Sequence, residues 1–446
     1  MQAEPAAPPS PSPELPQDWR RFLQSLALAA QIALVVASLI LLVRWLPDTL
    51  GRWDNEEDSD FPNFNGAAVL VREGHGDKLY DEDVLPNDLE YCRGRFEGEG
   101  EFSAGGGPHN ACRALAANFR SPPSILLVYL PLSLLPGKAP YIVSFLFCVA
   151  GALALAAYPT RYLAAPLPRL AFFLAVLSLP IVHFAVRFSQ PSMLYALALL
   201  AGFVLQRRGN HVAAAVAFSV LGFKPQFLVL PLALLAYWRD WKTVGWTVGI
   251  VVAALLAGFV IVGPDAAVNY VEFNLKLLQG GPDSPFVRPG WVFQQNLMYN
   301  WDGFLRALTG EGQSLIARLL TLSTLLFLVN AWARERNFAP AATVAVSLLA
   351  TPYVLFYDWT IAAAALALFF FLIKDPRQRL LGGGLAIGVW VAIWVTHKSI
   401  PVFGGDDALP DGSIYWATLA LAGALLVAGV ALWPREKNFA AGPARR

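Results

Sequence analysis

Repeated apolar runs constrain the fold of this chain more than any other feature of its sequence. The first extends from about Phe22 to Leu46, and others follow at about residues 139–157, 169–186, 191–206, 211–223, 225–237, 243–262, 314–333, 339–351, 358–373, 380–396 and 413–433. A helix of about 20 apolar residues crosses the ~30 Å hydrocarbon core of a bilayer. Charged residues make up 15% of the 446-residue chain, against about 25% in soluble domains. The pattern predicts an all-α polytopic membrane protein with about 12 transmembrane helices, in a range of about 10 to 13.

The runs also divide the chain into one membrane domain with two large loops. Residues 1–19 are rich in proline, which predicts disorder. The first run is too long for a cleavable signal peptide, so residues 20–433 are expected to form one transmembrane domain, followed by a cytoplasmic tail at 434–446. Polar composition places the loops at 47–122 and 263–312 outside the membrane. The proline-bounded segment Ser121–Pro136 is too short to cross, and it predicts a half-helix or a short juxtamembrane helix.

Basic residues gather in connections that fall on one side of the predicted bundle. They lie at residues 20–21, 160–169, 206–208, 238–242, 334–336, 374–379 and 434–437. Connections rich in Lys and Arg stay in the cytoplasm. This rule predicts a multi-pass protein of the cell membrane (plasma or inner) with both termini cytoplasmic. Polar residues at several helix breaks then share the extracytoplasmic face, where ionisable groups near the membrane are usually functional.

Asp60 is the strongest candidate for a catalytic group. A carboxylate at the end of a span can act as the general base that accepts a proton from an attacking hydroxyl. The competing interpretation is a solvated acidic loop, because the acidic stretch 54–58 precedes it. Phe61 and Phe64 favour the functional interpretation, since they would anchor this end of the loop at the membrane surface and hold Asp60 still.

Two basic residues are candidates for binding a lipid phosphate. Lys224 lies between two short apolar segments and before a proline, where its ammonium group could neutralise a phosphate leaving group. Arg187 precedes another helix break and could bind the same phosphate. The alternative for Lys224 is a lysine at a helix end whose ammonium group extends to the membrane surface.

Amide, aromatic and acidic side chains on the same face are candidates for binding a sugar or an acceptor. Gln190 follows Arg187, and Gln295 and Asn296 lie beside Trp291 and Phe293 in the second loop. Tyr357 and Asp358 begin a late apolar run. Each has a structural alternative, namely a helix cap for Gln190 or Asp358 and an interfacial aromatic belt for the Gln295 region.

Other features restrict partners and cofactors without naming one. The net charge of +1 predicts no nucleic-acid partner. Cys92 and Cys112 lie in the first loop, and the sequence leaves open whether they form a disulfide or stay unpaired. No Cys/His metal cluster occurs, so no metal ligands are expected, and the acidic stretch 54–60 is only a weak signal for a divalent cation.

Taken in order, these motifs resemble glycosyltransferase family 87, within the GT-C superfamily of membrane enzymes that take sugar from polyprenyl-phosphate carriers. The opening signature is D-F-P-N-F-N-G-A-A-V-L-V-R-E-G-H-G-D-K-L-Y-D, from Asp60 to Asp81. The segments S-P-P-S-I-L-L-V-Y-L-P-L-S-L-L-P, F-S-Q-P-S, F-K-P-Q-F-L-V-L-P-L-A-L-L, F-Q-Q-N-L and A-T-P-Y-V-L-F-Y-D-W then follow in the family's order. Tyr80 and Asp81 close the signature and join the candidates for sugar or acceptor binding.

Three positions depart from the family's pattern. Ser121 stands where tyrosine is usual, Asn65 where tryptophan or tyrosine is common, and Ser189 where glycine is usual. These departures leave the identity of the transferred sugar open.

The resemblance implies a GT-C-type bundle and a specific chemistry. Asp60 would be the catalytic base of an inverting transfer, in which a hexose (mannose-like) or related sugar moves from a polyprenyl-phosphate donor to an extracytoplasmic lipid or glycan acceptor. The lipid phosphate would leave against Lys224, with Arg187. The alternatives are a ligase or polymerase that uses a lipid-linked glycan, and a transporter or flippase.

Overall fold

The computed structural model describes residues 17–51, 53, 59–80, 119, 121–163, 165–279, 300–309, 314–351, 354–372, 376–398 and 416–431. The main α-helices are α1 (Gln17–Gly51), α2 (Phe61–Arg72), α4 (Leu126–Leu132), α5 (Ala139–Ala157), α6 (Pro166–Leu177), α7 (Pro180–Arg187), α8 (Ser192–Arg207), α9 (His211–Ser219), α10 (Val229–Tyr237), α11 (Trp241–Val262), α12 (Pro264–Gln279), α13 (Trp301–Thr309), α14 (Ser314–Arg334), α15 (Ala339–Ala350), α16 (Thr360–Leu372), α17 (Pro376–Lys398) and α18 (Trp416–Ala431). Short 3-10 helices join them, including η4 (Pro123–Ile125), η6 (Val220–Phe223), η7 (Pro225–Phe227) and η9 (Phe356–Trp359). The described part of the chain is 86% helix and contains no strand, which confirms the all-α prediction.

Every apolar run of the sequence contains a helix, but length limits which helices can span a membrane. Within the described residues, four helices are long and apolar enough to cross alone: Gln17–Gly51, Ala139–Tyr162, Trp241–Val262 and Leu315–Arg334. The bent pair α6 and α7 raises the number to up to five. The remaining apolar helices have 10–17 residues. The apolar helices indicate a membrane protein, while the expected bundle of about 12 transmembrane helices stays a prediction.

The run at 169–186, predicted as one span, contains a break and is compatible with a single bent span. It is divided into α6 and α7, which are bent by 51° relative to each other. The break lies at Leu179, whose φ of −62° and ψ of 127° are extended, directly before Pro180. Proline clashes with a helical residue before it, so the preceding residue leaves the α region.

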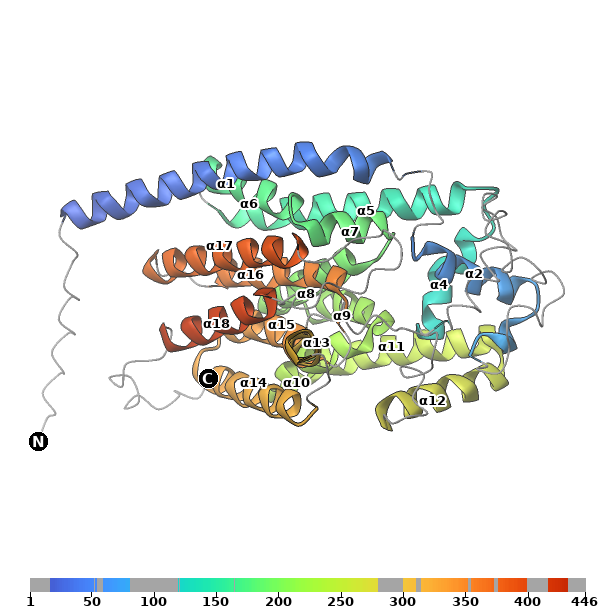
Figure 1. The fold of residues 1–446 in the computed structure, drawn as a ribbon. Coiled ribbons are helices and arrows are strands. Elements are labelled where there is room, and N and C mark those ends of the chain that lie inside the picture. Colours follow the sequence, from blue (N-terminus) through green and yellow to red (C-terminus); the bar gives the residue numbers. More distant parts are fainter. Residues whose placement is uncertain are drawn as a thin grey trace, which may run out of the picture.

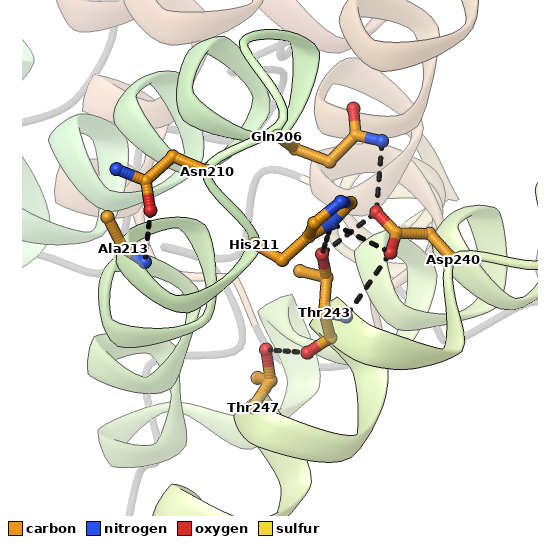
Figure 2. Close-up of polar contacts among 7 residues, drawn as sticks. All are labelled: Gln206, Asn210, His211, Ala213, Asp240, Thr243 and Thr247. Carbon is orange, nitrogen blue, oxygen red and sulfur yellow. Dashed lines mark hydrogen bonds and ion pairs between the residues drawn. The ribbon is translucent and has the colours of Figure 1, made fainter.

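Two polar corners close the end of the bundle where α8 meets α9 and α10 meets α11 (Figure 2). Asp240 is the N-cap of α11 and accepts hydrogen bonds from the Thr243 backbone N–H at 3.2 Å and hydroxyl at 2.8 Å. Its carboxylate also accepts from Gln206 Nε2 at 3.0 Å and lies 3.0 Å from His211 Nδ1. Asn210 caps α9 in the same way, through Ala213. These contacts join the two corners side by side.

The other end of the bundle carries α2 and α4, which lie beside the junction of α11 and α12 (Figure 1). The segment expected at Ser121–Pro136 is a short helix, η4 followed by α4. It packs closely on α11, because a Cβ atom at Gly258 would lie 2.5 Å from the backbone at Pro123 and Ser124. Glycine at this position permits that contact. This end holds Asp60.

Candidate functional site

The connection between α7 and α8 determines where Gln190 lies. The Ser189 N–H donates to the Val186 carbonyl at 3.0 Å, and the Gln190 N–H donates to the Ala185 carbonyl at 2.8 Å. These two bonds form a Schellman motif, which needs a residue with left-handed backbone after the helix. Ser189 supplies it with a φ of 49°. The C-terminal turn of α7 thereby fixes the direction in which Gln190 leaves the helix.

Asp60 lies directly before α2 and contacts this connection. It occupies the N-cap position, yet its side chain makes no capping hydrogen bond. Its carboxylate instead accepts a hydrogen bond from Gln190 Nε2, and its backbone N–H donates to the Phe188 carbonyl at 3.1 Å. Aspartate at an N-cap usually bonds the first turn of its own helix. Here the α7–α8 connection binds both the backbone N–H and the side-chain carboxylate of Asp60.

Phe61 and Phe64 hold Asp60 in place, but not at the membrane surface as expected. Both side chains are buried. Phe64 stacks on Tyr129 of α4 with ring centroids 5.1 Å apart, and Phe61 packs edge-on against Tyr141 of α5 at 5.5 Å. The expectation was wrong because α4 and α5 provide aromatic partners inside the protein, and burial of such rings is favourable.

Asp358 and Lys224 form a buried ion pair. Lys224 Nζ lies 2.6 Å from Asp358 Oδ1, and the Ser192 hydroxyl donates to the same oxygen at 2.9 Å. The second carboxylate oxygen accepts from the Leu355 backbone N–H at 3.2 Å. Lys224 itself follows η6 at the break between α9 and α10, as its sequence context predicted. A buried carboxylate with three donors is well satisfied.

Aromatic rings surround the ammonium group of Lys224. Its Nζ lies 5.0 Å from the centroid of the Tyr357 ring and 5.9 Å from that of Tyr195. Such distances are in the range of cation–π attraction. The Tyr357 ring in turn lies 6.4 Å from that of Phe188. The ring contact links the Lys224 pair to the residue whose carbonyl binds Asp60.

One short segment therefore connects both carboxylates. From residue 188 to residue 192, Phe188 and Gln190 bind Asp60, and Ser192 binds Asp358. We call Asp60, Gln190, Ser192, Lys224 and Asp358 the polar cluster. It brings together four residues that the sequence had marked separately: Asp60, Gln190, Lys224 and Asp358.

In the described part of the chain, two buried polar atoms in this segment and one on α2 lack a hydrogen-bond partner. Within the described residues, Ser189 Oγ, Gln190 Oε1 and Asn65 Oδ1 make no hydrogen bond. Ser189 and Gln190 are buried, and so is Asn65 on α2. Buried polar groups are normally bonded, so these three atoms are exceptions among the buried groups.

The remaining candidates lie elsewhere or outside the described residues. Arg187 pairs with Asp48 at the end of α1, with 3.5 Å between Nη1 and Oδ2. The Tyr80 hydroxyl donates to the Ser121 carbonyl at 2.8 Å, and burial, together with nearby Tyr270, raises the pKa of Tyr80 well above its usual value. Outside the described residues lie Asp81, Cys92, Cys112, Gln295, Asn296 and the acidic residues at 54–58.

Comparison with known proteins identifies the family of this chain. The sequence profile of glycosyltransferase family 87 matches residues 119–357, which is more than half of the chain. The chain belongs to glycosyltransferase family 87. It is therefore a glycosyltransferase, as the resemblance of its motifs implied. No curated protein and no solved structure matches it.

The family 87 match covers Gln190, Ser192 and Lys224, whereas Asp60 lies before it and Asp358 directly after it. Sequence reasoning did not single out Ser192 or Tyr195. Ser192 stands two residues after Gln190 at the start of α8, and Tyr195 lies one turn further on. Their spacing could have indicated them, because residues in the first turn of a helix lie close to the functional segment that precedes it.

Proposed function

We propose that this family 87 enzyme transfers a hexose or related sugar from a polyprenyl-phosphate donor to a lipid or glycan acceptor on the extracytoplasmic face of the cell membrane. The observation that carries the proposal is the hydrogen bond between Asp60 and Gln190 in a segment that also binds the Lys224–Asp358 pair. This segment thereby connects a carboxylate base, Asp60, to a cation, Lys224, and both residues lie at helix breaks.

In the proposed reaction, Asp60 accepts the proton of the acceptor hydroxyl. The acceptor oxygen forms a bond to the anomeric carbon while the bond from that carbon to the phosphate oxygen breaks. The polyprenyl phosphate leaves with the bonding electrons, and the anomeric configuration inverts. Gln190 orients the Asp60 carboxylate for this transfer, since its amide occupies one of the two carboxylate oxygens.

Lys224 neutralises the charge that develops on the leaving phosphate. An ammonium group has three donors, and one of them is directed at Asp358. Asp358 is buried and fully bonded, so its contacts support a role in positioning Lys224 better than the direct sugar binding first expected. The unpartnered atoms of Ser189, Gln190 and Asn65 are the candidates for sugar or acceptor hydroxyls.

Replacement of Asp60 tests the proposed base. General base catalysis contributes about 10²- to 10⁴-fold to a rate, so Asp60→Asn should lower turnover by that factor while expression and thermal stability stay close to wild type. The measurement is transfer of radiolabelled sugar from a polyprenyl-phosphate donor by purified enzyme. Near-normal turnover in Asp60→Asn would remove Asp60 from the mechanism.

A second acidic residue near the same helix serves as the matched control. Asp77 is partly exposed and pairs with Lys78 at 3.1 Å. Asp77→Asn should leave turnover unchanged, because exposed ion pairs contribute little and the residue is outside the polar cluster. Replacing the monophosphate donor with a diphosphate-linked one distinguishes the proposed transferase from a ligase or polymerase, and counterflow uptake in proteoliposomes tests for transport.

A further inference from the structure

An apolar cavity lies between four helices, away from the polar cluster. Its volume is about 600 Å³, and α1, α6, α16 and α17 form its walls. Its lining includes Leu26 and Ala30 of α1, Leu163 before α6, and Gly383 and Trp390 of α17. In Figure 1, α1 and α6 run alongside α17 and α16 over this part of the bundle. The cavity begins at Leu163 and reaches Leu179 at the other end of α6.

Small residues keep this space open. Alanine or glycine lines the cavity at positions 27, 30, 171, 175, 363, 383, 384 and 386. A Cβ atom added at Gly383 or Gly384 would meet nothing within 4 Å. The small side chains at these positions therefore contribute to the opening.

The lining selects hydrocarbon over water. The space is half open, and an ordered water in it would need two to four polar partners. Gln31 is the one polar residue among the lining residues besides Trp390, whose indole N–H is already donated to the Ala175 carbonyl at 3.1 Å. Next to the cavity, α1 exposes the apolar side chains Leu28 and Ile32. Such a surface contacts lipid chains in a membrane protein.

A guanidinium group lies at the Leu163 end. Arg169 Nε donates to the Leu163 carbonyl at 2.6 Å, and the side chain is exposed. Leu163, which accepts this hydrogen bond, and Pro168, which directly precedes Arg169, both line the cavity. The apolar lining of the cavity can contact a lipid chain, and the arginine at its end can pair with the phosphate headgroup of that lipid.

We propose that this cavity binds one acyl chain of an anionic phospholipid, whose phosphate pairs with Arg169, in the leaflet at the Leu163 end of the bundle. Asp60 lies beyond the opposite end of α1, so the site is separate from the proposed transfer chemistry and does not depend on it. A phospholipid, and not the prenyl chain of the donor, is the expected occupant because the guanidinium is at the end of the cavity remote from Asp60.

Native mass spectrometry of the full-length protein in detergent tests the site. The protein is incubated with equimolar phosphatidylglycerol and phosphatidylcholine, and the retained lipids are counted. Wild type should retain phosphatidylglycerol about fivefold in preference to phosphatidylcholine, the factor expected for one arginine near an anionic headgroup. Arg169→Gln should bring the two lipids to equal retention, and Lys242→Gln, at the start of α11, should leave the preference unchanged.

A cavity-filling variant separates the chain from the headgroup. Gly383→Leu should abolish retention of both lipids, because the leucine side chain would occupy the cavity. Gly388→Leu is the matched control, since it lies on the same helix in open space and does not line the cavity. Equal retention by wild type and Gly383→Leu would overturn the proposal. Displacement of phosphatidylglycerol from the wild type by polyprenyl phosphate, with no effect of Arg169→Gln, would also overturn it and assign the cavity to the donor.

Discussion

Ser189 adopts a backbone conformation that serine rarely takes. Its φ of 49° completes the Schellman motif at the end of α7, and only Arg239 shares a positive φ among the described residues other than glycine. A left-handed residue with a Cβ atom costs about 1–2 kcal/mol. Ser189→Gly should therefore keep or raise the free energy of unfolding, by up to about 1 kcal/mol, whereas the β-branched Ser189→Val should lower it. Unfolding in mixed detergent micelles measures both.

Arg239 provides the comparison for Ser189. It completes the same motif at the end of α10, where its N–H donates to the Ala236 carbonyl at 2.9 Å, and Lys224 of the polar cluster lies before the other end of this helix. Arg239→Gly should change stability as Ser189→Gly does, without changing transfer. A gain in stability at Arg239 but a loss at Ser189 would contradict the idea that backbone strain dominates at both sites.

The Lys224–Asp358 pair should show strong coupling. Removing one partner of a buried pair leaves a charge without compensation and costs about 3–5 kcal/mol, while replacing both partners with apolar residues is often neutral. Asp358→Leu should therefore destabilise the protein more than the double variant Lys224→Met/Asp358→Leu. A double-mutant cycle of unfolding free energies measures the coupling, and additive effects of the two substitutions would contradict the contact.

At the residue scale, the sequence identified most of the polar cluster but not its contacts. Asp60, Gln190, Lys224 and Asp358 could be marked because each stands at a break between apolar runs. The partners could not be predicted, because the pairing of Asp358 with Lys224 depends on how α8, α10 and α16 meet. Asp60, Gln190 and Lys224 were expected to share one face, and the hydrogen bonds of Gln190, Ser192 and Asp358 link Asp60 to Lys224.

At the element scale, the contact between η4 and α11 positions the aromatic residues that hold Asp60. A Cβ atom at Gly258 would lie 2.5 Å from Pro123 C and Ser124 N, both backbone atoms that have little freedom to move. Gly258→Ala should therefore lower the free energy of unfolding by about 1–3 kcal/mol, the usual cost of overpacking. It should also lower transfer, because α4 carries Tyr129, which contacts Phe61 and Phe64.

Gly249 is the control on the same helix. A Cβ atom there would meet nothing within 4 Å. Gly249→Ala should raise stability, by up to about 1 kcal/mol, because alanine favours a helix over glycine. If both substitutions were equally tolerated, the close contact of η4 with α11 would be absent.

The elements themselves were largely predictable from apolar periodicity and length. Predicted and observed bounds agree exactly for α5, at residues 139–157. The break at Leu179 was overlooked because Pro180 was counted as part of a long apolar run, although proline disfavours a helical residue before it. Helices α12 and α13 were not predicted, since they lie in the second loop and are shorter or more polar than the spans.

At the scale of the whole molecule, the two ends of the bundle differ in chemistry. The polar cluster lies where α8 begins and before α10, and the corners joined by Asp240 lie where α8 and α10 end. Figure 2 shows these corners. The one-sided distribution of basic residues predicts that the end with Asp240 faces the cytoplasm, and this orientation stays a prediction. The number of spans could not be predicted from apolar runs, because a run of 13 residues and a run of 20 are equally apolar while only the longer one crosses a bilayer.

The corner around Asp240 gives a pH dependence of stability. Burial would raise the pKa of Asp240, but hydrogen bonds from Gln206 and Thr243 and the nearby His211 outweigh it, so the pKa lies below the usual 3.8. A carboxylate whose pKa is lowered on folding stabilises the protein fully above its unfolded pKa, and this contribution is lost as the pH falls through the folded value. The melting temperature of wild type should thus exceed that of Asp240→Asn at pH about 6, and the difference should shrink below pH about 3.8.

Asp77→Asn supplies the baseline, because the partly exposed Asp77 pair contributes little at either pH. A constant difference between wild type and Asp240→Asn across this range would show that the Asp240 contacts stabilise the corner without depending on its charge.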